Sequence, residues 1–204
     1  MHSVRPECKL TQRRARVRCE AARLTVERGY DAFTMDDLAE RVGVSRRTLF
    51  NVVPDKESAV LGLEPDFKTS DEGALFRECG PTGDLVPDLL AMFEAVMSRL
   101  SGDDAAAASR TAADHLLYTE ALAADPKVLA MAHARAARHT QEVAELIASR
   151  ERWPADDLRA RSLAAAVGSL VGVSFDEVAR RGGTTPVAEV FRETVDAFVA
   201  ATRG

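Results

Sequence analysis

Hydrophobic and polar positions repeat with the period of an α-helix along most of this chain. In the first segment, Val17, Ala21 and Leu24 fall on one stripe of a helix predicted over about residues 11–28. Gly29 follows this stripe and is expected to end the helix, because glycine commonly occupies the position just past a helix terminus. The pattern therefore predicts an amphipathic first helix with one buried face.

Two short helices separated by a glycine-containing turn are predicted next. The hydroxyl of Thr34 can accept a hydrogen bond from a free amide at the start of the first of them. Gly43 suits the positive φ of a tight turn, and Ser45 is expected to cap a second helix over about residues 46–53. A further helical stretch is expected over residues 56–61. Two short helices joined in this way predict a helix-turn-helix.

A larger helical body is expected from residue 61 onward. Residues 61–84 hold repeated glycines and prolines and predict broken helix and loop, followed by helices over about residues 85–100, 103–123, 126–150, 155–181 and from 186. Between residues 163 and 173 only Ser169 is polar, a run below the roughly 18–20 residues that span a bilayer. Such a helix needs cover on every side. We therefore expect the last two helices to form a dimer interface through Leu163, Val167, Leu170, Val171, Val190, Phe191 and Phe198.

Charge is distributed unevenly along the chain. The whole sequence carries a formal net charge of −5, yet residues 1–60 hold 12 basic and 9 acidic side chains against 15 and 23 in the remainder. A basic N-terminal segment followed by an acidic remainder favours a polyanionic partner for residues 1–60. The basic N-terminal arm could also be a merely solvated segment.

The composition bears on compartment and chemistry. Abundant alanine and few aromatic residues favour helix, and the charged N-terminus lacks a secretory signal, so the protein is expected in the cytoplasm without a membrane partner. We expect no enzyme activity, catalytic residue, cofactor or metal site, because no nucleophile motif, phosphate loop or metal-ligand spacing occurs. Cys8, Cys19 and Cys79 have no paired spacing; a redox switch through one of them is the alternative to control by a ligand.

Arg46 and Arg47 open the second helix of the predicted helix-turn-helix. Adjacent arginines at a positive helix end are unfavourable for the helix itself, so a polyanion would explain them. Residues at this point of the motif meet base edges in the major groove, where arginine can donate two parallel hydrogen bonds to guanine.

The pattern Gly29-Tyr30-x-x-Phe33-Thr34-x-x-x-Leu38-Ala39-x-x-x-Gly43-Val44-Ser45-x-x-Thr48-Leu49-Phe50, followed by Pro54-x-Lys56-Glu57, resembles the N-terminal domain of TetR-family transcriptional regulators. The resemblance implies an all-α homodimer with a three-helix DNA-binding domain, here residues 1–60, and a ligand-binding and dimerisation bundle, here residues 61–204. It further implies that Thr34, Thr48 and Lys56 contact phosphates, while Arg46, Arg47, Phe50 and Asn51 face the groove beside Ser45. Thr34 and Ser45 could serve only as caps, and Phe50 could belong to the core.

One position departs from the family pattern, and the effector is unspecified. Val52 stands where the family usually has a tyrosine or histidine that contacts phosphate, so DNA affinity is expected to rest more on the basic arm. The function expected is that of a repressor released from a palindromic operator by a small apolar or amphipathic molecule. Candidate pocket residues are those with adaptable or polar-tipped side chains on the later helices, namely Met92, Phe93, Met97, His115, Tyr118, Met131, His139, Trp153 and Phe175.

Overall fold

The computed structural model describes residues 6–62, 65–102 and 104–203, except for the side chains of residues 6–9, 11, 100 and 203. All regular structure in this described part is helical, which confirms the predicted all-α fold. The chain divides into two compact units: unit 1 comprises residues 1–64 and 114–134, and unit 2 comprises residues 65–113 and 135–204. Unit 1 therefore contains the predicted N-terminal domain together with a segment from the middle of the chain.

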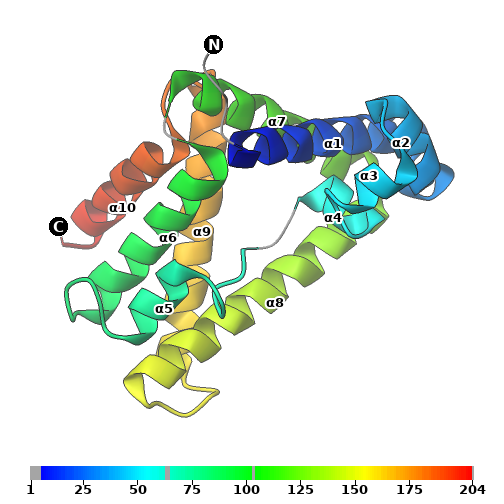
Figure 1. Cartoon of the computed structure of the whole chain (residues 1–204). Helices are drawn as coiled ribbons and strands as arrows, with labels where there is room; N and C mark the ends of the chain where they lie inside the picture. Colours follow the sequence, from blue (N-terminus) through cyan, green and yellow to red (C-terminus); the bar gives the residue numbers. More distant parts are fainter. Residues whose placement is uncertain (1–5, 63–64, 103, 204) are drawn as a thin grey trace. The chain divides into compact units, whose positions relative to one another are not determined.

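Unit 1 is built on the long first helix. Its elements are α1 (Pro6–Arg28), the 3-10 turn η1 (Tyr30–Ala32), α2 (Met35–Val42), α3 (Arg46–Phe50), α4 (Lys56–Leu61), the end of α7 (Ala105–Ala124) and the start of α8 (Pro126–Glu151). Helix α1 packs against α2 and α4, and α2 against α3 (Figure 1). The core gathers apolar side chains from α1, α2, α3, α4, α8 and the turns beside them, namely Val17, Ala21, Leu24, Phe33, Leu38, Ala39, Val42, Leu49, Val52, Val53, Ala59, Val60 and Val128.

Two predicted boundaries in unit 1 are corrected. Helix α1 begins at Pro6 rather than near residue 11, so most of the expected basic arm is helical. Helix α3 ends at Phe50 rather than near residue 53. The chain leaves the helix there because Val52 and Val53 turn inward and pack in the core, where they are 8% and 3% exposed.

Unit 2 is a bundle around a second core. It contains α5 (Asp71–Arg77), α6 (Leu85–Ser101), α9 (Leu158–Arg180), α10 (Val187–Arg203), the start of α7 and most of α8. Helix α10 packs against α9 and α6, and α5 packs against α6 (Figure 1). Between residues 65 and 84, the described part of the expected broken stretch, the one helix is the short α5. Ser70 caps its start by accepting a hydrogen bond from the amide of Gly73 at 3.1 Å.

Helix α9 is the one helix in the described part of the chain that is long and apolar enough, by length and composition alone, to cross a membrane. It runs for 23 residues, while its continuous apolar run, residues 163–173, stays shorter than a bilayer span. Only 22% of its most apolar window is buried within the chain. Leu158 and Val173 are 72% and 52% exposed. Much of this apolar helix therefore lacks cover from its own chain.

Candidate DNA-binding surface

The start of α2 is fixed by a reciprocal pair of hydrogen bonds. The Thr34 hydroxyl accepts from the amide of Asp37 at 3.2 Å, and the carboxylate of Asp37 accepts from the amide of Thr34 at 2.6 Å. The hydrogen bond from the Thr34 side chain lowers the pKa of the Asp37 carboxyl. This capping box satisfies amides that would otherwise lack a partner and sets where α2 begins.

The turn between α2 and α3 depends on one glycine. Gly43 has φ 74° and ψ 38°, the left-handed conformation, and its amide donates to the carbonyls of Ala39 and Glu40. The amide of Val44 also returns to the carbonyl of Ala39 at 2.9 Å. Any residue with a side chain would strain this left-handed backbone, so Gly43 determines how α3 follows α2.

Helix α3 has one face in the core and one face open. The Ser45 hydroxyl accepts from the amide of Thr48 at 3.1 Å, and the two hydroxyls lie 2.8 Å apart. Leu49 is fully buried, whereas Phe50 is 41% exposed. The exposed side chains on and just before this helix are those of Ser45, Arg46, Arg47, Phe50 and Asn51, and Thr48 is half-buried. The segment expected to read DNA thus presents its polar residues outward.

Arg46 is held by two neighbours on this surface. Its Nη1 lies 2.6 Å from Oδ2 of Asp36, which is in the first turn of α2. Its guanidinium carbon lies 5.4 Å from the centre of the Phe50 ring. The sequence allowed Phe50 either in the core or facing the groove. The structure places it on the exposed surface, in contact with an arginine. Arg47 is also exposed, and it has no ion pair with another described residue.

Lys56 occupies a different position from the other predicted contacts. Its ammonium donates to the backbone carbonyls of Tyr30 and Phe33 and lies 4.5 Å and 4.0 Å from their ring centres. Partial burial lowers the pKa of the Lys56 ammonium. Lys56 therefore joins α4 to the turn before α2, and this arrangement uses two of its three donors within the chain. A phosphate contact from Lys56 stays a prediction.

Two residues next to this surface, Val52 and Arg41, contact the rest of unit 1. Val52 is 8% exposed and packs in the core, so the family's phosphate-contacting position is filled here by a core residue. Arg41, in the last turn of α2, makes ion pairs with Glu20 at 3.1 Å and Glu27 at 2.6 Å on α1. These pairs fix α2 along α1 from outside the core.

A group around Asp114 was missed by sequence reasoning. Asp114, on the part of α7 within unit 1, is buried, and it accepts from the Arg18 guanidinium and from the Cys19 thiol, whose sulfur lies 2.8 Å away. Burial, together with the hydrogen bond to Asp114 and the charge of that carboxylate, raises the pKa of Cys19 to about 12. The thiolate is therefore disfavoured, which gives no support to a redox switch at Cys19. Cys79 is exposed, and the side chain of Cys8 lies outside the described residues.

The candidate effector residues do not form one group. His115, Tyr118 and Met131 belong to unit 1, and the other six belong to unit 2. Met92 and Met97 are buried in the unit 2 core, with Phe93, Trp153 and Phe175 packed against it. His139 meets the ring of Phe67 edge-on at 6.1 Å, and the Arg159 guanidinium lies 3.9 Å from the Trp153 ring centre.

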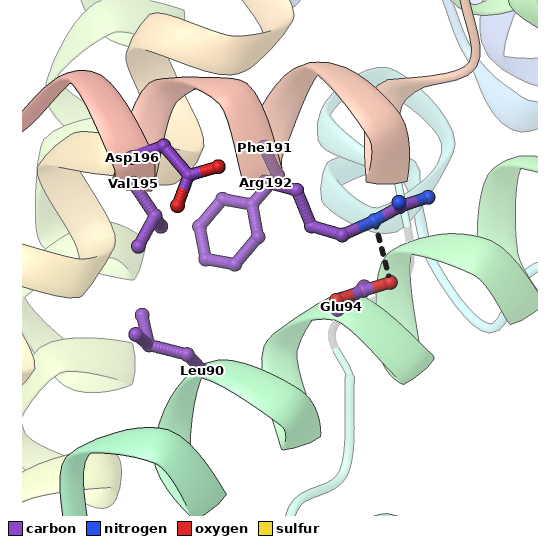
Figure 2. Close-up of a pocket in the computed structure, with 6 residues that line it drawn as sticks. All are labelled: Leu90, Glu94, Phe191, Arg192, Val195 and Asp196. Carbon is purple, nitrogen blue, oxygen red and sulfur yellow. Dashed lines mark ion pairs between the residues drawn. The ribbon is translucent and has the colours of Figure 1, made fainter.

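A shallow cavity of about 150 Å³ lies between α6 and α10 in unit 2. Figure 2 shows its six lining residues, with Arg192 of α10 ion-paired to Glu94 of α6 at 2.8 Å. None of the nine candidate effector residues lines it; the lining residues are Leu90, Glu94, Phe191, Arg192, Val195 and Asp196.

The residues expected at a dimer interface separate into two groups. Val167, Val190 and Phe191 are 4%, 0% and 1% exposed, so they pack inside their own chain and offer no surface to a partner. This burial removes them from the expected interface. Phe198 is 48% exposed, and the remaining three are half-buried on α9, namely Leu163, Leu170 and Val171.

Comparison with known proteins matches the region just described. A family model for bacterial regulatory proteins of the tetR family covers residues 20–58. An uncharacterized HTH-type transcriptional regulator of Mycobacterium bovis is 37% identical over 84 residues, which is 41% of this chain and 42% of that protein. Two such regulators of Mycobacterium tuberculosis strains are 36% identical over the same length. The chain thus matches less than half the length of these relatives. In its N-terminal helix-turn-helix region, residues 20–58, the chain is therefore similar to the regulators of the tetR family.

Proposed function

We propose that this protein is a sequence-specific DNA-binding transcriptional regulator, and that it represses from a palindromic operator until a small molecule releases it. The observation that supports this most directly is the exposed pair Arg46 and Arg47 on α3, within the region that matches the family model. The relatives are named as transcriptional regulators, which agrees with the proposal. Arginine side chains on such a helix can donate to guanine in the major groove.

A homodimer is part of this proposal. Two recognition helices about 34 Å apart would meet successive major grooves of a palindrome. The apolar residues that remain open on α9 and α10 suit a self-complementary contact, because an exposed apolar patch of this kind marks an interaction site. With the three buried residues removed and the exposed Val173 added, the proposed interface consists of Leu163, Leu170, Val171, Val173 and Phe198. A second copy as the cover for α9 is consistent with a cytoplasmic protein.

The effector is proposed to be small and apolar or amphipathic and to bind unit 2. Support comes from the methionines of its core, Met92 and Met97, because flexible thioether side chains adapt to irregular ligands. No catalytic step is proposed, since the regulators that the chain resembles are defined by binding. Thermal-shift screening of apolar compounds would identify the ligand class by a rise in the unfolding midpoint.

The proposal is tested by selecting binding sites from a randomised duplex library with the purified protein. We expect a palindromic consensus and an affinity that falls steeply with salt, because phosphate contacts release counterions. Arg46→Ala should weaken binding by about 1–3 kcal/mol and relax the preference at one base pair. Arg110→Ala, which removes an exposed arginine from the unit 2 part of α7, is the matched control and should leave that preference intact. Failure of the wild type to enrich any sequence would contradict the proposal.

A further inference from the structure

We propose that Asp36 is a positioning residue for DNA reading: it holds the Arg46 guanidinium so that one donor edge faces a guanine. This inference rests on the proposed DNA-binding function. It adds a residue that touches no base itself and yet determines specificity at the base pair that Arg46 reads.

The geometry of the pair leaves a defined part of the guanidinium available. Arg46 uses Nη1 for Oδ2 of Asp36 at 2.6 Å. The opposite edge of a guanidinium presents Nε–H and Nη2–H as two parallel donors. Guanine presents O6 and N7 as two neighbouring acceptors in the major groove. A guanidinium held through Nη1 therefore keeps a complete two-donor edge for one base.

A second contact restricts the plane of the same group. The guanidinium carbon of Arg46 lies 5.4 Å from the ring centre of Phe50, one turn along α3. A contact with a ring face and a hydrogen bond at one corner together leave a long side chain few orientations. Orientation before binding lowers the entropy lost when the base contact forms. Phe50 remains 41% exposed, so this arrangement sits on the open surface rather than in the core.

Asp36 lies in the first turn of α2, where the helix dipole favours a carboxylate, but the start of this helix does not depend on it. The capping box of α2 is made by Thr34 and Asp37, so Asp36 is not needed for it. The Asp36 and Arg46 side chains are 59% and 64% exposed, and ion pairs this exposed contribute little to folding. An acidic group beside a DNA-reading arginine also opposes the approach of phosphates. Asp36 therefore reduces general attraction to DNA while it orients Arg46, and both effects favour discrimination between sequences.

The experiment compares Asp36→Asn with Glu40→Gln, using the consensus duplex selected by the wild type and the same duplex changed at the Arg46-dependent base pair. Glu40 lies one turn further along α2 and is exposed, so its variant loses the same charge. Both variants should bind the altered duplex a few-fold more tightly, because a repelling charge is gone. Only Asp36→Asn should lose discrimination between the two duplexes, by about tenfold.

A double-mutant cycle with Arg46→Ala separates positioning from a structural effect. In the Arg46→Ala background, Asp36→Asn should change affinity no more than Glu40→Gln does, because no guanidinium remains to be oriented. Thermal unfolding of each variant checks that the fold is retained. Unchanged discrimination in Asp36→Asn, or an equal loss in Glu40→Gln, would overturn the assignment while leaving the DNA-binding proposal standing. If the wild type selects no sequence at all, the proposed function itself fails.

Discussion

The two units of this protein each bury an aspartate against an arginine, but the two pairs differ in their access to water. In unit 1, Asp114 is 8% exposed while the side chain of its partner Arg18 remains 38% exposed. In unit 2, the side chains of Asp88 and Arg150 are 0% and 1% exposed and lie 2.6 Å apart. The pair in unit 1 can regain solvent if one partner is lost, whereas the pair in unit 2 cannot.

The outer surfaces of the two units differ in polarity. The surface of unit 1 around α3 is polar and basic, with Arg46, Arg47 and Asn51 exposed. Unit 2 leaves large apolar side chains open on α9 and α10, including Val173 and Phe198. Unit 1 therefore presents a surface suited to a charged partner, whereas unit 2 leaves an apolar face that its own chain does not cover.

The largest expected effect follows from breaking the unit 2 pair. Asp88 accepts from the hydroxyl and amide of Thr82 at 2.7 Å as well as from Arg150. Asp88→Asn therefore leaves the buried guanidinium with only the partly exposed Glu151, 3.3 Å from its Nε, as a counter-charge. We expect the unfolding midpoint to fall by on the order of 10 °C. The matched variant Asp114→Asn in unit 1 should lower it less, because Arg18 can be hydrated. Equal losses in a thermal unfolding experiment at neutral pH would break the comparison.

The same pair gives a dependence on pH. Burial raises the pKa of the Asp88 carboxyl, but the hydrogen bonds from Thr82 and the pairing with Arg150 outweigh it, so the net shift is downward. A carboxyl with a lowered folded pKa stabilises the protein above its unfolded pKa of about 3.9, and this stability is lost as pH falls through the folded value. The difference between wild type and Asp88→Asn should therefore shrink below about pH 4. A difference that stays constant down to acid unfolding would contradict this origin.

The next effect concerns the open apolar face of unit 2. Val173→Glu and Phe198→Glu place carboxylates where a second chain is proposed to pack, and each occurs twice in a symmetric dimer. We expect the dissociation constant of the dimer to rise by at least about tenfold, as measured by sedimentation over a dilution series. Glu189→Gln on the exposed side of α10 is the control and should leave the mass unchanged. A wild type that sediments as a single chain at all concentrations would remove the dimer from the proposal.

The sequence was sufficient where structure depends on neighbouring residues. The cap at Thr34, the left-handed turn at Gly43 and the cap at Ser45 each act within four residues, and all three were predicted and are observed. The all-α class followed in the same way from periodicity. The end of α3 was missed because Val52 and Val53 gain more from the core than from one further helical turn.

The rest depends on contacts between distant residues, which a pattern along one chain does not show. Asp114 meets Arg18 from 96 positions away, and Asp88 meets Arg150 from 62 positions away. Nothing local distinguishes these aspartates from exposed ones. Lys56 likewise stands beside two acidic residues in the sequence, yet its ammonium lies 4.5 Å and 4.0 Å from the ring centres of Tyr30 and Phe33. The Asp36–Arg46 pair joins two helices across the turn and was missed for the same reason.

The smallest expected effect tests the one backbone position that links the two short helices of unit 1. Gly43→Ala adds a methyl group that would meet no other atom within 4 Å, so any loss arises from the positive φ alone. We expect a loss of about 1–2 kcal/mol in the free energy of unfolding. Gly43→Asn should lose less, because asparagine tolerates the left-handed conformation better. Denaturant unfolding of the two variants measures the difference. Equal losses in both would mean that the constraint at Gly43 is not conformational, and the claim that unit 1 is determined by local residue choice would then lose its clearest support.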